Sequence, residues 1–129
     1  MDPIADMIIR LKNASLAGRE VVSVPRSKLK LAIAEKLKSR GFVREVAVRG
    51  KKADKTIEFV LARANDGGFR ITDVKRVSKP GCRVYCGATD IMPVRGGSGV
   101  VVISTPRGVL FGDEARKECV GGEVLFELW

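Results

Sequence analysis

The apolar residues of this chain change their spacing near Phe42, from a helical repeat to the two-residue alternation of strands. Before that point the spacing predicts two amphipathic helices with a short strand, Val21 to Val24, between them. After it, the apolar runs are short and are separated by turns rich in glycine, proline and asparagine. We therefore expect helices packed on a small sheet, followed by a region built mainly of strands.

The first helix is predicted to begin at Asp2-Pro3, because aspartate can cap free backbone amides and proline fits the first helical position. It ends between Asn13 and Gly18, and its apolar stripe consists of Ile4, Met7, Ile8 and Leu11. The second helix runs from about Ser27 to Arg40 and stops at Gly41. Its apolar stripe is Leu29, Ile33 and Leu37, and its other faces carry Lys28, Lys30, Lys36, Lys38 and Arg40.

Strands are predicted over most of the remaining chain. Alternation at Val46 and Val48 and again at Ile57, Phe59 and Leu61 indicates a hairpin joined by the basic turn Arg49 to Lys55. The other expected strands are Phe69 to Val77, Cys82 to Tyr85, Val100 to Ser104, Val109 to Phe111 and Glu123 to Trp129. We expect Gly96-Gly97 to bend the chain into the Val100 strand, and Asp113 to cap a short helix from Glu114 to Glu118.

These elements predict an α+β protein of two small α/β domains. Residues 1–66 form an N-terminal domain of two helices on a three-stranded sheet, and residues 67–129 form a C-terminal, β-rich domain with one short helix. The longest apolar stretch, Val100 to Ile103, is far shorter than the roughly 20 residues that cross a bilayer. The N-terminus lacks a basic and apolar leader, so we expect a cytoplasmic protein of bacterial or plastid origin without a membrane partner.

The charge is distributed unevenly along the chain. Residues 1 to 80 hold 19 basic and 9 acidic side chains, whereas residues 81 to 129 hold 5 and 6, so the net charges are +10 and −1. A basic surface of this kind attracts a polyanion by neutralising its phosphates and releasing their counterions. The alternative is a solvated basic face that only keeps the protein soluble.

Several residue types argue against an enzyme or a metal protein. The chain has no histidine, and its three cysteines lack a second Cys-x-x-Cys pair, so neither structural zinc nor another cofactor is expected. Cys82 and Cys86 lie four residues apart in a predicted strand, where ordinary packed thiols are favoured over a disulfide. Glu123 and Glu127 have the same spacing and so could share a face, although nothing in the sequence indicates that they are buried together.

Two glycine-containing turns are candidates for ligand binding. Gly96-Gly97-Ser98-Gly99 precedes a strand and lacks the lysine and helix start of a phosphate-binding nucleotide loop. Ser104-Thr105-Pro106-Arg107-Gly108 lies between two apolar strand runs, which would hold two hydroxyls, a guanidinium and backbone amides at a fixed spacing. Such donors suit phosphates, sugar 2′-hydroxyls and base edges, although hairpin ends with this composition are often purely structural.

Five separated motifs resemble the bacterial type of small-subunit ribosomal protein number eight, over essentially the whole chain. They are Asp2-Pro3-Ile4-Ala5-Asp6-Met7 with Arg10 and Asn13; Pro25-Arg26-Ser27-Lys28-Leu29-Lys30; Lys75-Arg76-Val77-Ser78-Lys79-Pro80-Gly81 with Arg83 and Tyr85; Gly99 to Thr105 with Arg107-Gly108-Val109; and Asp113, Ala115-Arg116 and Gly121-Gly122-Glu123. The resemblance implies a two-domain, non-enzymatic protein that binds a helical element in the central region of 16S-type ribosomal RNA and supports folding and assembly of the small subunit. Neighbouring small-subunit proteins are its other expected partners, and the chain itself is expected to be a monomer in the ribosome.

The resemblance also implies a set of RNA-binding residues, most of them in the C-terminal domain. Carried over by position, they are Ser104, Thr105, Arg107, Gly108, Tyr85, Gly121, Gly122 and Glu123, with Asn13, Ser27, Lys28 and Lys30 in the N-terminal domain. The chain departs from the family at Pro106, where a serine is common, and at Cys86-Gly87, where basic residues are common. We therefore expect the C-terminal loop to recognise shape through hydrogen bonds, and the basic N-terminal domain to supply more of the electrostatic attraction.

A protein-interaction module and a small enzyme that uses carboxylates are the two alternatives from other classes. The first is distinguished by titration with structured RNA, which a pure protein-binding module would not bind. The second would require a carboxylate cluster, and the acidic residues are instead scattered beside basic neighbours.

Overall fold

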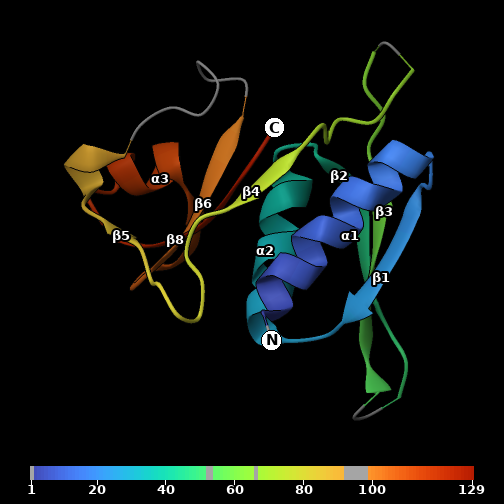
Figure 1. Cartoon of the computed structure of the whole chain (residues 1–129), viewed down its shortest axis with the longest axis horizontal. Helices are drawn as coiled ribbons and strands as arrows, with labels where there is room; N and C mark the ends of the chain where they lie inside the picture. The colour runs from blue at the N-terminus through green and yellow to red at the C-terminus, as the bar shows by residue number, and fades with distance from the viewer. Residues whose placement is uncertain (1, 52–53, 66, 92–98) are drawn as a thin grey trace. The chain divides into compact units, whose positions relative to one another are not determined.

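The computed structural model of the chain describes residues 2–51, 54–65, 67–91 and 99–129. Its contacts divide it into two compact units, one formed by Asp6–Thr72 and the other by Met1–Ala5 with Asp73–Trp129. Figure 1 shows the first mainly in blue to green and the second mainly in yellow to red. Asp66, the last residue of the predicted N-terminal domain, lies outside the described residues, and so does the predicted bend at Gly96-Gly97.

The unit formed by Asp6–Thr72, called the N-terminal unit below, has two helices and a three-stranded antiparallel sheet. Its elements are α1 (Pro3–Ala17, from Asp6 onward), β1 (Val21–Pro25), α2 (Lys28–Ser39), β2 (Val43–Arg49) and β3 (Thr56–Leu61). The strand order is β1-β3-β2, so β1 is an edge strand. Alternate strand residues such as Val22, Val24 and Phe59 are buried, as are Leu11 of α1 and Ile33 of α2. The fold class predicted from the sequence is confirmed here.

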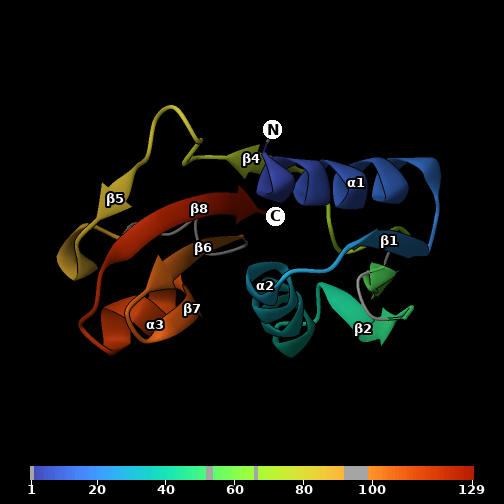
Figure 2. The same ribbon diagram turned by 90° about the horizontal axis from the view of Figure 1, so that it is seen from below.

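The other unit, called the C-terminal unit below, is built mainly of strands. It contains β4 (Val74–Arg76), β5 (Tyr85–Cys86), the 3-10 helix η2 (Ala88–Asp90), β6 (Val100–Thr105), β7 (Gly108–Phe111), α3 (Gly112–Lys117) and β8 (Gly122–Leu128). The sheet has the order β4-β8-β6-β7, and β5 also pairs with β8. In Figure 2 the long β8 runs beside β6, with α3 close to β7. One core cluster of this unit consists of Ile91, Ile103, Leu110, Ala115 and Val124.

The helix boundaries follow the caps that the sequence predicts. Asp2 Oδ1 accepts a hydrogen bond from the Ala5 N–H at 3.2 Å, which satisfies one free donor at the start of α1. Ser27 caps α2 in the same way, because its hydroxyl accepts from the Lys30 N–H at 3.2 Å. Gly18 and Gly41 follow the two helices with φ of +74° and +79°, a conformation that favours glycine. None of the helices in the described part of the chain has the length and apolar character needed to span a membrane.

Two predicted strands are shorter than expected. Phe69 to Val77 forms a strand only at Val74–Arg76, because this segment divides its hydrogen bonds between two partners. Arg70 N–H donates to Ala62 O at 2.9 Å, whereas Val74–Arg76 pairs with β8. In the segment from Cys82 to Tyr85 only Tyr85 is in a strand, which continues to Cys86. The backbone groups of Lys79 and Cys82 are hydrogen-bonded to each other across a tight turn, so Cys82 does not pair with the sheet.

Three further expectations are corrected. Phe111, not Asp113, is the N-cap of α3, and Asp113 lies in the first turn. The cysteines are free thiols, and Cys86 is half-buried against the core, but Cys82 is exposed rather than packed because it lies in a turn. Glu123 pairs with Ser104 and Glu127 with Val101 across an irregularity in the β6–β8 register. Since Ser104 and Val101 are three residues apart, the two glutamates point to opposite faces.

Candidate nucleic-acid interface

Three of the predicted RNA-binding residues lie side by side on adjacent strands of the C-terminal sheet. Glu123 of β8 pairs with Tyr85 of β5 on one side and with Ser104 of β6 on the other. Residues directly opposite each other in antiparallel strands point to the same face, so the three side chains form one row, called the transverse row below. Tyr85 is 71% exposed, although it is one of the largest side chains in the unit. Strand pairing thus brings together residues from three separate parts of the sequence.

Two glycines allow the strands to approach at this row. A Cβ atom built on Gly122 would lie 2.1 Å from Ser104 O, and one on Gly121 would lie 2.3 Å from Cys86 O. Both neighbours are backbone atoms, which a side chain cannot displace without moving a strand. Gly121 and Gly122 therefore hold the backbone of β8 against β5 and β6, and their role in the site is to position its other residues.

Glu123 is held by two groups of its own unit. Its Oε2 accepts hydrogen bonds from the Ser78 hydroxyl and from Arg83 Nη1, the latter at 2.9 Å. The Ser78 hydroxyl, followed by Arg83, holds the pKa of Glu123 below its ordinary value, although burial acts in the opposite direction. Ser78 is fully buried and also accepts from the Val84 N–H at 3.2 Å. Glu123 thus fixes the segment that leads into Tyr85, and sequence reasoning missed Ser78 because its motif indicated only a turn.

The turn after Ser104 is shaped by Thr105. The Thr105 hydroxyl donates to Gly108 O at 2.7 Å and accepts from the Arg107 N–H at 3.1 Å. Gly108 has φ of +105°, which permits the tight reversal between β6 and β7. Pro106, Arg107 and Gly108 are all exposed. Arg107 lies 3.4 Å from Glu118, but its side chain remains 62% exposed, and such surface pairs are weak.

The four predicted residues of the N-terminal unit have different surroundings. Asn13 on α1 and Lys28 on α2 are exposed, and Ser27 is the α2 cap described above. Lys30 is only 6% exposed, and its ammonium group donates to Pro25 O at 3.1 Å. The structure therefore places Lys30 in a local contact with β1, whereas the sequence suggested that it was displayed on the surface.

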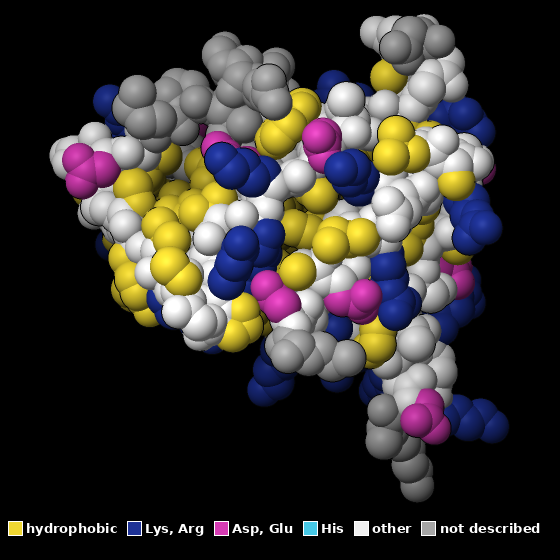
Figure 3. Space-filling view, in the orientation of Figure 1, with side chains coloured by type: hydrophobic (Ala, Val, Ile, Leu, Met, Phe, Trp, Pro, Cys, Tyr) yellow, Lys and Arg dark blue, Asp and Glu magenta, His cyan; other side chains and the backbone are white. Residues whose placement is uncertain are grey.

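Three arginines of the N-terminal unit lie beside carboxylates. Arg10 and Asp6 are 3.2 Å apart, Arg44 and Glu20 are 3.5 Å apart, and Arg49 and Glu58 are 3.6 Å apart. Figure 3 shows the same interspersion, with magenta carboxylates next to several dark blue side chains. Because these pairs are largely solvated, they leave the overall positive potential of the surface in place.

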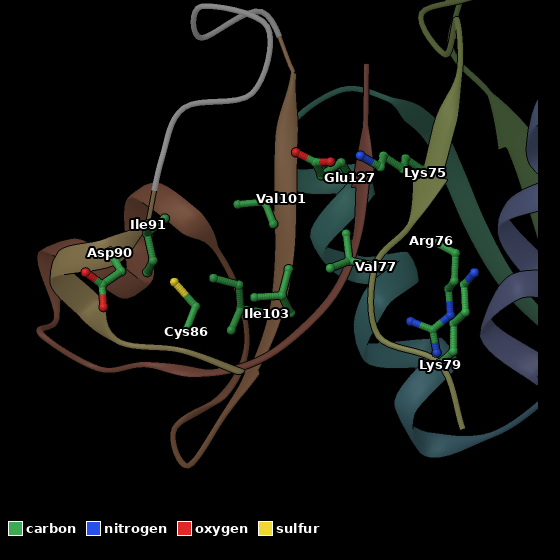
Figure 4. Close-up of a pocket in the computed structure, with 11 residues that line it drawn as sticks. Lys75, Arg76, Val77, Lys79, Cys86, Asp90, Ile91, Val101, Ile103 and Glu127 are labelled. Atoms are coloured by element: carbon green, nitrogen blue, oxygen red, sulfur yellow. The ribbon is translucent and has the colours of Figure 1, made fainter. Parts of the chain in front are cut away.

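A cavity of about 380 Å³ lies on the other face of the C-terminal sheet (Figure 4). Val101, Ile103 and Val124 form part of its wall, and these residues alternate with those of the transverse row. Lys75 and Glu127 lie together at one end of it, and Asp90 at another. None of the predicted RNA-binding residues lines this cavity, so it is separate from the row.

Comparison with known proteins places the chain in a family. The family described as Ribosomal protein S8 matches residues 2–129. The chain is similar to the small ribosomal subunit protein uS8 of Roseiflexus castenholzii, with 50% identity over 128 residues that cover 99% of this chain and 97% of the relative. The protein of the same name from Solibacter usitatus is 48% identical over 128 residues, covering 99% and 98%. The chain therefore belongs to the ribosomal protein S8 family.

Proposed function

We propose that this chain is a structural, non-enzymatic constituent of the small ribosomal subunit that contacts 16S-type ribosomal RNA through the transverse row and the adjoining turn. Its target is a helical element in the central domain of that RNA, whose folding and assembly it supports. Membership of the family and the net charge of +9 support RNA as the partner. Its place is the ribosome, in contact with neighbouring small-subunit proteins.

The observation that carries the proposal is the alignment of Tyr85 and Ser104 on either side of Glu123. Next to them the turn Thr105 to Gly108 is exposed except for the half-buried Thr105. An exposed tyrosine ring can stack on a base or sugar, and a hydroxyl can bond a phosphate or a 2′-hydroxyl. Because strands hold these groups, the surface is already arranged for an RNA of fixed shape before binding.

The residues of this surface have two kinds of role. Tyr85, Ser104, Arg107 and the backbone of Gly108 are the proposed contact groups, since they lie at or near the surface. Glu123, Thr105, Gly121 and Gly122 are positioning residues, because their hydrogen bonds or close backbone contacts hold strands and the turn in place. In the N-terminal unit, Asn13 and Lys28 remain proposed contacts, and Ser27 and Lys30 support them by capping α2 and by holding β1.

Footprinting on naked small-subunit ribosomal RNA tests the proposal. We expect the wild-type protein to protect one compact helical site and to bind more weakly as salt is raised. Tyr85→Ala should weaken binding by about 1–3 kcal/mol, the range for losing one stacked base. Leu16→Ala is the matched control, because Leu16 is also 71% exposed but belongs to α1. Equal losses for both variants, or no protected site, would contradict the proposal in favour of a protein-binding module.

Ser104→Ala tests the hydrogen-bonding part separately. It should lower affinity by about 1 kcal/mol with the salt dependence unchanged, because a neutral hydroxyl releases no counterion. Ser39→Ala is the control, since the Ser39 hydroxyl is exposed at the end of α2 and donates to Lys36 O at 2.6 Å. A lower salt slope for Ser104→Ala would show that the loop acts through charge instead.

A further inference from the structure

The three-stranded sheet of the N-terminal unit has two edge strands, β1 and β2, which lie on its two outer sides (Figure 2). The β1 edge is closed by side chains of the same unit. Arg10 Nη1 donates to Ser23 O at 3.0 Å, and Lys30 Nζ donates to Pro25 O at 3.1 Å. Pro25 has no N–H, so it offers the edge no donor. Such contacts and prolines protect an edge from the addition of a further strand.

The hydrogen bonds of β3, the central strand, show which peptide groups of β2 face its free edge. Leu61 N–H donates to Glu20 O at 2.8 Å, on the β1 side. Successive residues of a strand direct their peptide groups to opposite sides, so the odd-numbered residues of β3 bond to β1 and the even-numbered ones to β2. The β2 residues opposite the even-numbered ones are Glu45, Ala47 and Arg49. The peptide groups of Val46 and Val48 therefore point away from the sheet.

The segment from Glu45 to Val48, called the β2 edge below, is open where the β1 edge is closed. Among the described residues, no group outside the sheet bonds to the peptide groups of Val46 or Val48. Their side chains lie opposite the fully buried Phe59 and Ile57, so they face the core side of the sheet. Val48 nevertheless remains 43% exposed. A strand added here would bond to both peptide groups and cover the exposed valine.

The charges of β2 favour a peptide over a nucleic acid at this edge. Arg44 and Arg49 already lie beside Glu20 and Glu58, at 3.5 Å and 3.6 Å. Glu45 is exposed, and in the part of the chain that the structure describes it forms no ion pair. The open peptide groups include carbonyl oxygens, which accept hydrogen bonds and repel phosphate. An extended peptide with a basic side chain near Glu45 complements both features.

We propose that the β2 edge docks an extended segment of a neighbouring small-subunit protein, which becomes a fourth strand of the sheet. Hydrogen bonds to the peptide groups of Val46 and Val48 hold its backbone, as in other complexes formed by strand addition. Its alternate side chains meet the two faces of the edge: an apolar one covers Val48, and a basic one lies beside Glu45. The inference rests on the proposed function, because the partner is met in the small subunit, but it concerns a different surface from the RNA contacts.

Amide hydrogen exchange of the full chain tests the new hydrogen bonds directly. We compare the free protein, its complex with naked small-subunit ribosomal RNA, and the assembled small subunit. The N–H groups of Val46 and Val48 should exchange about tenfold more slowly in the assembled subunit alone, since only there are they bonded. The Ser23 N–H, which faces the β1 edge, is the control and should not change. Slowing by RNA alone, or equal exchange in all three states, would overturn the inference.

A proline at the edge tests whether these bonds matter for assembly. Val48→Pro removes an N–H that faces outward and therefore breaks no bond to β3. In competition with wild type for subunits reconstituted from RNA and the other small-subunit proteins, it should be incorporated about 5- to 10-fold less, with unchanged affinity for naked RNA. Val48→Thr, which keeps the N–H, and Val21→Pro, at the β1 edge, are the controls. Normal incorporation of Val48→Pro, with wild-type unfolding in urea, would contradict strand addition.

Glu45→Gln tests the chemistry of the partner and does not depend on a proline being tolerated. Incorporation should fall about 2- to 5-fold, the range for one lost surface ion pair, without loss of affinity for naked RNA. Glu35→Gln is the matched control, because Glu35 is an exposed glutamate of α2. A gain in RNA affinity for Glu45→Gln alone would show an RNA surface and overturn the inference. If wild type fails to bind RNA, the proposed function is wrong; if it binds and assembles while none of these effects occurs, strand addition alone is excluded.

Discussion

The two units differ in charge and in how they hold their proposed RNA contacts. Asp6–Thr72 contains 16 basic and 7 acidic residues, a net charge of +9, whereas Met1–Ala5 with Asp73–Trp129 contains 8 of each and is neutral. Yet the neutral unit contains the transverse row, in which strand pairing aligns Tyr85, Glu123 and Ser104. The difference shows how long-range attraction of RNA and recognition of its shape can lie in separate units of a small protein.

The glycines that end the N-terminal helices differ in role from those beside the transverse row. In the N-terminal unit, Gly18 and Gly41 end helices with positive φ and have nothing within 4 Å of a built Cβ. In the C-terminal unit, Gly121 and Gly122 instead permit close approach between strands. Substitution of the first pair strains the local backbone, whereas substitution of the second pair separates strands of the site.

Among the substitutions that test this difference between the units, Gly122→Ala should have the largest effect on stability and RNA binding. A Cβ there would lie 2.1 Å from Ser104 O, so the strands must separate, and we expect a loss of about 3 kcal/mol in the free energy of unfolding with loss of RNA binding. Urea unfolding and RNA affinity measure both. Gly81→Ala is the control, because nothing lies within 4 Å of its Cβ. Normal stability and affinity for Gly122→Ala would show that the close approach does not matter.

Substitutions of Lys30 and Lys28 test whether both lysines of the basic unit attract RNA. Lys30→Ala should lower the free energy of unfolding by about 2 kcal/mol, because the buried stem and the hydrogen bond to Pro25 O are both lost. Lys28→Ala should leave unfolding unchanged within about 0.5 kcal/mol and lower the salt slope of RNA binding by about one. The reverse pattern would show that Lys30, not Lys28, acts on RNA.

The lowered pKa of Glu123 should make the stability of the neutral C-terminal unit depend on pH. Hydrogen bonds from Ser78 and Arg83 lower the pKa of Glu123 below its ordinary value of 4.5. The stabilisation is therefore present above about pH 4.5 and is lost as pH falls through the lower pKa of the folded state. Glu123→Gln should cost about 1 kcal/mol at pH 7, and the difference from wild type should shrink in acid.

Urea unfolding of both proteins between pH 7 and pH 3 measures this dependence. Asp2 does not confuse the comparison, because both proteins retain it. Burial acts to raise the pKa of Asp2, but the hydrogen bonds from Arg76, Ala5 and Ile4 and the charge of Arg76 together outweigh it, and the net shift is downward. A difference between the two proteins that stays constant with pH would mean that the charge of Glu123 is not what stabilises the unit.

Cys119→Gly should have the smallest effect and the opposite sign. Cys119 follows α3 with φ of +57°, at the position where the N-terminal unit has Gly18 and Gly41 after its helices. Glycine removes the strain of this conformation but adds disorder to the unfolded chain, so we expect a net gain of about 0.5 kcal/mol. Thermal unfolding measures it, and Cys82→Gly serves as a control for thiol loss. Destabilisation by Cys119→Gly would show that the thiol itself packs usefully.

Much of the fold was predictable because its signals are local. Asp2 and Ser27 cap their helices, the apolar stripe of α1 is buried, and the β2–β3 hairpin pairs as expected. In α2, Ile33 and Leu37 are buried, but Leu29 is 38% exposed, whereas Lys30 beside it is buried. Phe69 to Val77 was overestimated as a strand, because sequence alone does not reveal that its hydrogen bonds go to two different partners. The sequence and the family resemblance predicted which residues belong to the candidate site. They did not predict that Tyr85, Glu123 and Ser104 lie side by side.

The sequence by itself determined the helices, the main strands, the uneven charge and the family, since caps, periodicity and composition depend on residues close together along the chain. Only the tertiary structure decided that Glu123 faces Ser104 while Glu127 faces the opposite side, and that Lys30 is enclosed against Pro25. The physical reason is that strand register and burial arise from pairing between residues far apart in sequence. One irregularity in that pairing reverses the face to which every later side chain points.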